Sequence, residues 1–134
     1  MKKQAMAVLS IFVSWTIIDY VIHGLLLSDL YRQTAQLWRP MPEMNMGLMY
    51  AVTMVGALVL VLMFDRFVQT KNKNTAMQFG FLFGLSAGTS MGFGSFSVMP
   101  IPFVMAFVWF LGVVVQGTVA GMLLALTMGD EKRV

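Results

Sequence analysis

The chain contains no cysteine. This absence excludes disulfides, thiolate metal sites, iron–sulfur clusters and thiol nucleophiles. Charge is also scarce, because only 11% of the 134 residues are charged whereas 58% are hydrophobic. A soluble domain is expected to have about 25% charged residues. The nine Lys and Arg and six Asp and Glu side chains are too few to cover a water-facing surface. The composition therefore predicts an integral membrane protein.

The patterns of common catalytic sites are missing as well. The sequence has no GxSxG, no HExxH, no phosphate-binding loop and no paired carboxylates within one helix. This disfavours acyl transfer, phosphoryl transfer and zinc-dependent hydrolysis, so we expect a protein that is not an enzyme and has no cofactor. The net charge of +3 gathers at the ends of apolar segments. That pattern indicates contact with membrane lipids and not with nucleic acid.

Four apolar stretches are long enough to cross about 30 Å of hydrocarbon. They cover residues 5–27, 47–64, 76–99 and 102–127, with uncertain ends. We predict an all-α fold, a four-helix transmembrane bundle that makes residues 1–134 a single domain. The first stretch is longer than the roughly 7–15 apolar residues of a signal peptide and lacks a cleavage motif after it. We therefore expect it to be a retained helix.

The basic residues predict the orientation of the bundle, because cytoplasmic loops of membrane proteins are enriched in Lys and Arg. One side would carry Lys2, Lys3, Arg66, Lys71, Lys73, Lys132 and Arg133, and the other only Arg32 and Arg39. This asymmetry places both termini in the cytoplasm of a multi-pass protein.

Glycines recur at every fourth position of the third stretch, at Gly80, Gly84, Gly88 and Gly92. The fourth stretch repeats the spacing at Gly117 and Gly121. Residues four apart share a helix face, and small residues let two backbones approach closely. The glycines therefore predict tight packing, either between these two helices or between two copies of the chain.

Asp19 and His23 are the most unusual residues of the first stretch. They are four positions apart, hence on one helix face, next to Tyr20. An Asp near the middle of a membrane costs on the order of 2.5–3.5 kcal/mol and indicates a functional site by default. The pair could hold helices together, or form a proton-sensitive or ligand-binding site. Counting along the helices places four further residues at a similar depth, which together with Tyr20 make a possible pocket layer: Thr53, Ser90, Met91 and Trp109. Gln116 is expected to lie deeper, as a separate polar point.

Two kinds of metal site are worth considering. Thioethers bind Cu(I), and Met41, Met44 and Met46 lie close together in the outer loop. Methionine is, however, also a common packing residue in helices. His23 is the single histidine of the chain, so haem would need a methionine or a second copy as its other ligand. Copper and haem therefore remain alternatives to a protein without metal.

Several short motifs together resemble a group of small, uncharacterised four-helix proteins of the bacterial inner membrane. The first stretch has Asp19 followed by His23-Gly24-Leu25-Leu26, an acid and an HGxLL motif. The loop after it has Tyr31 and Trp38-Arg39-Pro40. The third stretch opens with Gly80-Phe81-Leu82-Phe83-Gly84-Leu85, a GxxFGL motif, and ends at Pro100-Ile101-Pro102. The resemblance implies a four-helix fold in the bacterial cytoplasmic membrane and no particular activity. The methionine-rich run is not part of the group's pattern.

These observations favour a non-enzymatic accessory or structural subunit that packs against a larger membrane complex or against itself. The alternative is a small proton- or metal-linked transporter or permeation unit that uses Asp19 and His23.

Overall fold

The computed structural model describes residues 1–129, and every element in this part of the chain is helical. The long helices are α1 (Lys2–Asp19), α3 (Met46–Phe67), α4 (Lys73–Thr89) and α6 (Phe103–Met128). Shorter elements are two π-helical segments, η1 (Tyr20–Leu26) and η4 (Ser90–Gly94), the helices α2 (Ser28–Gln33) and α5 (Ser95–Val98), and the 3-10 turns η2 (Ala35–Leu37) and η3 (Met41–Glu43). The ends of the long helical segments agree with the predicted stretches within three residues.

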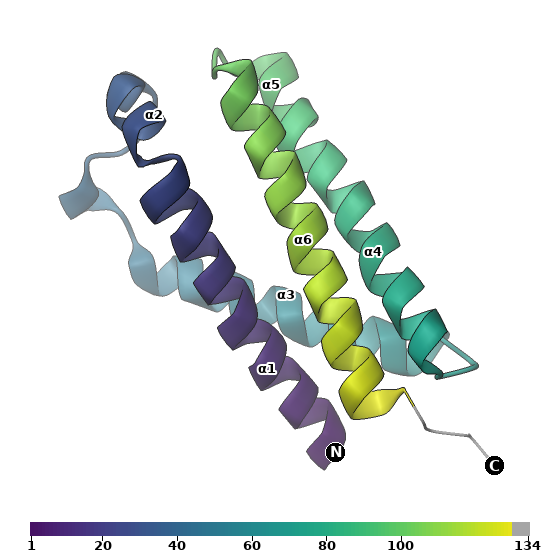
Figure 1. The fold of residues 1–134 in the computed structure, drawn as a ribbon. Helices are drawn as coiled ribbons and strands as arrows, with labels where there is room; N and C mark the ends of the chain where they lie inside the picture. Colours follow the sequence, from purple (N-terminus) through teal and green to yellow (C-terminus); the bar gives the residue numbers. More distant parts are fainter. Residues whose placement is uncertain (130–134) are drawn as a thin grey trace.

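Three of the long helices lie side by side, and the fourth crosses them (Figure 1). α6 lies between α1 and α4 and contacts both. α3 crosses behind them at a pronounced angle and contacts chiefly α1. The start of α1 and the end of α6 lie at the same end of the molecule, which we call the lower end because it is at the bottom of Figure 1. α2 lies at the opposite, upper end.

Three helical segments are long and apolar enough to cross a membrane: Lys2–Leu26, Met46–Phe67 and Phe103–Met128. The predicted third stretch is helical too, from α4 through η4 to α5, but it is not one of these three. Its many Gly, Ser and Thr residues make it less apolar. A membrane protein with three spanning candidates is therefore what the fold supports directly. The orientation prediction also used Lys132 and Arg133, which lie outside the described residues.

The glycines of α4 and η4 lie in the contact with α6. A methyl group added at Gly80 would collide with the backbone of Gly117 and Gly121. A methyl group at Gly92 would lie 2.5 Å from the carbonyl oxygen of Ala106. Real atoms do not approach so closely, so any larger residue would force the two helices apart. Within this chain the glycines therefore pack α4 against α6, one of the two predicted uses.

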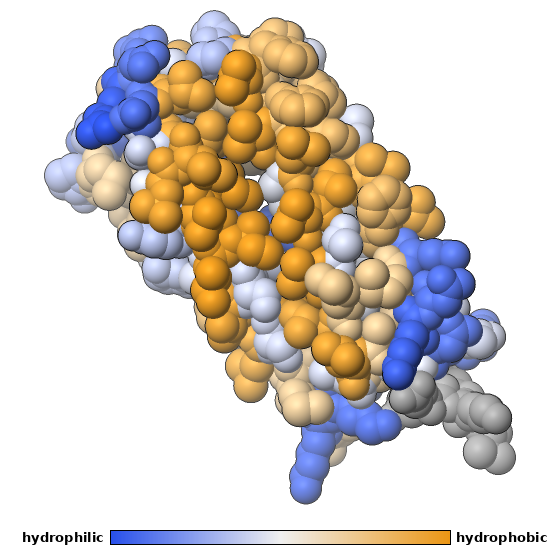
Figure 2. Space-filling model, in the orientation of Figure 1, coloured by the Kyte–Doolittle hydropathy of each residue, from blue (hydrophilic) through white to orange (hydrophobic). Residues whose placement is uncertain are grey.

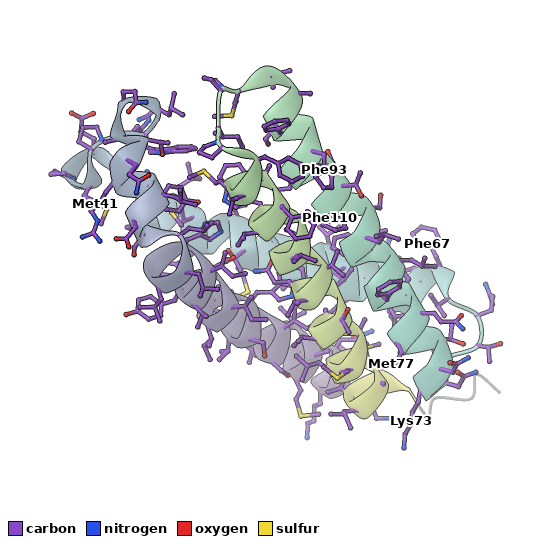
Figure 3. The ribbon with its side chains drawn as sticks, turned by 45° about the horizontal axis from the view of Figure 1, so that its top comes forward. Met41, Phe67, Lys73, Met77, Phe93 and Phe110 are labelled. Atoms are coloured by element: carbon purple, nitrogen blue, oxygen red, sulfur yellow. The ribbon has the colours of Figure 1, made fainter. Side chains whose placement is uncertain are left out.

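Two apolar cores fill the inside of the bundle. The lower core joins all four long helices through a set of buried residues: Ala7, Ile11, Trp15, Ala57, Leu60, Val61, Phe64, Ala76, Ala120, Leu124, Ala125 and Met128. The upper core joins η1, α6 and the chain segments beside them: Ile22, Leu27, Ile101, Met105, Ala106 and Trp109. The upper core contains no residue of α3 among those described. Aromatic pairs extend the packing of η4 on α6, where Phe93 and Phe110 face each other with ring centroids 5.2 Å apart (Figure 3).

α3 thus packs on the bundle only with its second half. Its buried residues begin at Ala57, whereas Leu48, Val52 and Val55 in its first half are 59%, 64% and 57% exposed. The surface of the molecule is largely hydrophobic, with hydrophilic atoms gathered mainly at the two ends (Figure 2). Figure 2 also shows a small hydrophilic area that is recessed among hydrophobic atoms. The first half of α3 therefore has no buried residue and no part in the upper core.

Candidate functional site: a polar network at the upper end of α1

Asp19 at the end of α1 is hydrogen-bonded to the neighbouring helix α6. The amide nitrogen Nε2 of Gln116 donates to Oδ1 of Asp19 over 2.7 Å. The predicted separation of Gln116 from this acid is therefore wrong. Depth was counted along straight helices, and that count did not include the relative shift of α1 and α6.

His23 lies one turn above Asp19, but the two side chains do not make a close pair. Nε2 of His23 and Oδ1 of Asp19 are 4.0 Å apart, which is longer than a hydrogen bond. The closer partner of His23 is Tyr31 of α2, whose hydroxyl lies 2.6 Å from Nδ1. The same hydroxyl accepts a hydrogen bond of 2.9 Å from Nε1 of Trp109 in α6. The site therefore joins α1, η1, α2 and α6.

The direction of these hydrogen bonds assigns a tautomer to His23. The indole nitrogen of Trp109 can only donate, so it occupies the oxygen of Tyr31 as an acceptor. The hydroxyl proton of Tyr31 is then directed to Nδ1 of His23. In the neutral ring the remaining proton is on Nε2, which lies on the side of Asp19. The imidazole is thus oriented as a proton acceptor toward the upper end and a donor toward Asp19.

Trp15 closes the network at its lower side. It lies one turn below Asp19 on α1, and its Nε1 donates to the carbonyl oxygen of Gln116 over 2.8 Å. Its ring stacks against Phe83 of α4 at 6.5 Å between centroids and contacts the position of Gly56 in α3. Trp15 therefore fills the space between all four long helices directly below the carboxylate.

A group of aromatic rings covers the upper side of the network. Trp38 packs edge-on against Tyr31 and against Trp109, with centroid distances of 5.3 Å and 6.0 Å. Its Nε1 donates to Oγ1 of Thr34 over 2.9 Å, and this threonine is buried. Trp38 thereby fixes the loop after α2 on top of α6 and holds Tyr31 in place.

The network is partly accessible in spite of these contacts. The side chains of Asp19 and His23 are 37% and 39% exposed. Along the first helical segment they lie one and two turns above Trp15. His23 is in a π-helical segment, shown by the hydrogen bond from the backbone nitrogen of Leu27 to the oxygen of Ile22, five residues earlier. Such segments widen a helix locally and occur often at functional sites.

Tyr31 lies outside the three apolar spans and is partly buried. Burial raises its pKa from 10.0 to about 12, since the ionised form loses its hydration. The hydrogen bond from Trp109 lowers the pKa in part, and the carboxylate of Asp19 raises it. Tyr31 is therefore neutral at ordinary pH, and its hydroxyl can act as a hydrogen-bond donor.

Of the predicted pocket layer, the structure brings Trp109 to Asp19 and His23. The other members lie elsewhere. Ser90 is exposed, Met91 is 45% exposed and Tyr20 is 66% exposed on the outside of the bundle. Thr53 donates to the carbonyl oxygen of Met49 within α3 and lines a groove at the upper end of that helix. Equal depth did not imply proximity, because the faces that these helices turn inward were unknown.

Sequence reasoning missed three residues of the network: Gln116 as the partner of Asp19, Tyr31 as the partner of His23, and Trp15 below them. Trp15 could have been found from the sequence, because it precedes Asp19 by one turn and therefore shares its face. The contacts of Gln116 and Tyr31 depend on how separate helical segments pack against each other. The spacing of residues within one segment does not show this.

The candidate metal ligands do not gather around His23. Met41 lies in η3 at the edge of the molecule (Figure 3) and is 75% exposed. Met44 and Met46 follow in the same loop and at the start of α3, and Met46 is 43% exposed. Within residues 1–129, no three His, Asp or Glu side chains lie close enough to hold a metal ion.

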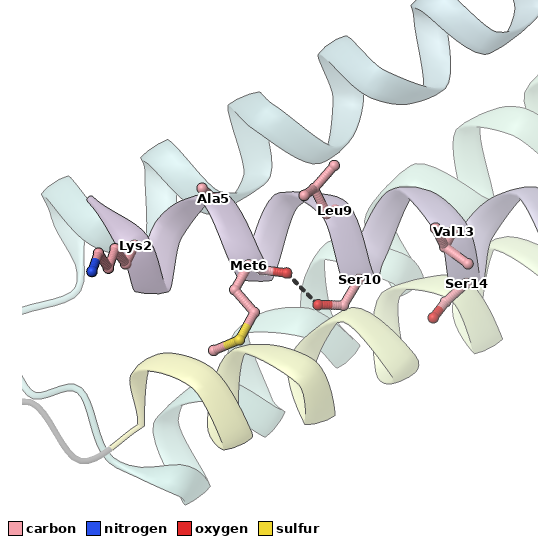
Figure 4. A pocket seen from close by; sticks show the side chains of 7 residues that line it. All are labelled: Lys2, Ala5, Met6, Leu9, Ser10, Val13 and Ser14. Atoms are coloured by element: carbon pink, nitrogen blue, oxygen red, sulfur yellow. Dashed lines mark hydrogen bonds between the residues drawn. The ribbon is translucent and has the colours of Figure 1, made fainter.

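Two shallow grooves lie away from the network. One is formed by α1 alone, from Lys2 to Ser14, where the Ser10 hydroxyl donates to the carbonyl oxygen of Met6 (Figure 4). The other lies between Arg39 and the first turns of α3. Neither includes Asp19 or His23. Comparison with models of protein families, with functionally described proteins and with solved structures finds no match to this chain.

Proposed function

We propose that this protein is a small, non-enzymatic subunit of the bacterial inner membrane that packs against a larger membrane protein or against a second copy. In this proposal the α4–η4–α5 segment is a fourth membrane helix, held by its glycines against α6, and both termini are cytoplasmic. The resemblance described above supports the bacterial location.

One observation carries the proposal: Asp19 and His23, which lie within an apolar span, have side chains that are 37% and 39% exposed. The first half of α3 is exposed as well. In lipid, every uncovered polar group costs several kcal/mol, because acyl chains offer no hydrogen bonds. A helix from another protein would cover Asp19 and His23 and supply partners for their free atoms. Association with another protein in the membrane therefore removes the free-energy cost of the polar groups that the isolated chain exposes to lipid.

Photo-cross-linking tests this proposal. A photoreactive amino acid at Val52, 64% exposed on the open half of α3, should form a protein adduct in native membranes. The same probe at Leu82, 60% exposed on α4, is the matched control and should react mostly with lipid. We expect the protein to migrate in mild detergent as part of a larger complex.

A lone monomer in native gels, together with only lipid adducts at Val52, would refute the proposal. Equal protein adducts at Val52 and Leu82 would refute the assignment of the open side as the contact surface.

The transporter alternative requires a path through the lower core. Trp15 and the backbone of Gln116 lie across that path and are hydrogen-bonded to each other. A single chain of this structure offers no such passage, and we do not adopt the alternative.

A further inference from the structure

The polar network connects the upper loop to a carboxylate inside an apolar span. Asp19 lies seven residues before Leu26, the end of the span, which corresponds to a depth of about 10 Å along the helix. Between the loop and this carboxylate lie two groups that can carry protons, the hydroxyl of Tyr31 and the imidazole of His23. Directly below it, Trp15 is hydrogen-bonded to the backbone of Gln116, and neither side chain carries protons in this way.

We propose that Tyr31, His23 and Asp19 form a proton half-channel, which exchanges protons between the water at the upper loop and the carboxylate of Asp19 and ends there. The half-channel goes beyond the role of a packing subunit. It makes the charge of Asp19, on the surface that a partner protein would cover, depend on the pH at the loop side. The half-channel rests on one part of the proposed function, namely that the chain is embedded in a membrane.

Each step of the transfer is balanced. Tyr31 gives its hydroxyl proton to Nδ1 of His23 and takes one from a water molecule at the loop. His23 releases its Nε2 proton to the carboxylate of Asp19. One proton has left the water and one has arrived on Asp19, with the tyrosine restored and the imidazole in its other tautomer. The same steps in reverse unload Asp19 and restore the first tautomer, so the site needs no separate resetting step.

The two proton transfers, from Tyr31 to His23 and from His23 to Asp19, differ in the distance that the proton must cross. The first crosses 2.6 Å between the Tyr31 hydroxyl and Nδ1, a hydrogen bond that is already formed. The second spans 4.0 Å between Nε2 and Oδ1, so the ring must move closer to the acid before it can transfer the proton. The side chain of His23 is 39% exposed and lies in a π-helical turn.

Few other groups compete for the proton. Asp19 faces Gln116 of α6, which stays neutral, and His23 faces Tyr31 and Trp109. The charges of Asp29 and Arg32 on α2 pair with each other at the surface. α3 has no charged side chain from residue 46 to 64. Among the described residues, the chain of close contacts from the loop to Asp19 thus runs through Tyr31 and His23.

Labelling with an apolar carbodiimide, which reacts with protonated carboxyl groups, can show to which side of the membrane the half-channel opens. Right-side-out and inside-out membrane vesicles hold the pH constant on one side while it is changed on the other. We expect labelling of Asp19, read by mass spectrometry, to follow the pH at the loop side alone. Labelling that follows the opposite side, or both sides equally, would overturn the half-channel. A proton leak through proteoliposomes that Asp19→Asn abolishes would overturn its closed end.

Tyr31→Phe tests the route, because it keeps the ring and removes the proton carrier. After a loop-side pH jump, rapid-mixing infrared spectroscopy should show protonation of Asp19 slowed by roughly a hundredfold, the low end of what a positioned proton-transfer group contributes. Tyr20→Phe, on the exposed side of the same π-helical turn, is the matched control and should respond like the wild type.

An unchanged rate in folded Tyr31→Phe would refute the route. If circular dichroism shows that this variant does not fold, His23→Gln takes its place with the same expectation. Cross-linking at Val52 is independent of these readings, so failure of the half-channel and failure of the proposed association can be told apart.

Discussion

At the scale of single residues, the cost of Asp19 in an apolar helix is offset by specific contacts. A carboxyl group near mid-membrane costs on the order of 2.5–3.5 kcal/mol. Gln116 donates to it over 2.7 Å, and hydrogen bonds between membrane helices contribute about 0.6 kcal/mol on average and up to about 1.7. One such bond does not offset the whole cost. The part of the cost that this bond does not offset is the reason why Asp19, whose side chain is 37% exposed, requires a further partner.

Tyr31 gives a pH dependence whose direction is fixed by its raised pKa. The unfolded chain releases the hydroxyl proton above pH 10.0, whereas the folded protein holds it up to about 12. Stability should therefore be unaffected below pH 10.0 and fall as the pH rises from there to about 12. Chemical unfolding in detergent micelles at about pH 9 and about pH 11 measures the loss. If the difference in stability between wild type and Tyr31→Phe is the same at both pH values, the tyrosine is not protected as the structure indicates.

At the scale of elements, the pairing of α4 with α6 depends on bare backbone at the contact. Gly80→Ala would place a methyl group against the backbone of Gly117 and Gly121. We expect a loss of about 1–3 kcal/mol in the free energy of unfolding, the usual cost of overfilling a packed contact. Reversible unfolding in mixed micelles measures it. Gly94→Ala is the matched control, because the nearest atom to the new methyl group would be Oγ of Ser90 at 3.9 Å. Similar losses in the two variants would show that backbone flexibility, and not close packing, determines the effect.

The elements were the most predictable level of this structure. Apolar runs bounded by charges and prolines placed the ends of the long helical segments within three residues. The spacing of the glycines predicted a tight contact, and the structure identifies α6 as the partner helix. The tilt of α3 was not predictable, because its first half is as apolar as its second half although only the second half is buried. The π-helical turns were also missed, since a locally wider turn changes few side-chain positions in the sequence pattern.

At the scale of the whole molecule, polar side-chain contacts among the described residues join α3 to its neighbours at the lower end but not at the upper end. The side chain of Lys71, in the loop between α3 and α4, is only 2% exposed and forms an ion pair with Asp65. Nε2 of Gln4 at the start of α1 donates to the same carboxylate over 2.7 Å. These contacts tie three segments together beside the lower core. The upper end has the aromatic contacts of the loop, and within residues 1–129 no residue of α3 belongs to the upper core.

Lys71→Met should therefore destabilise the protein by about 3–5 kcal/mol, the usual cost of removing one partner from a buried ion pair. The carboxylate of Asp65 would lose the buried cation of this ion pair. Thermal unfolding in detergent measures the effect. Lys73→Met, at an exposed position two residues later, should change the stability by no more than about 0.5 kcal/mol. Equal effects would mean that the positive charge of this region, and not the buried pair, is what matters.

The π-helical turn at Tyr20–Leu26 accommodates sequence length without changing the course of the chain. A π turn holds one residue more than an α-helical turn of similar height. Removing one residue would therefore let the turn close into an ordinary α-helix, with α2 following in much the same direction. Asp19 lies before the turn and would keep its bond to Gln116, whereas His23 lies inside it and would turn its ring away from the Tyr31 hydroxyl.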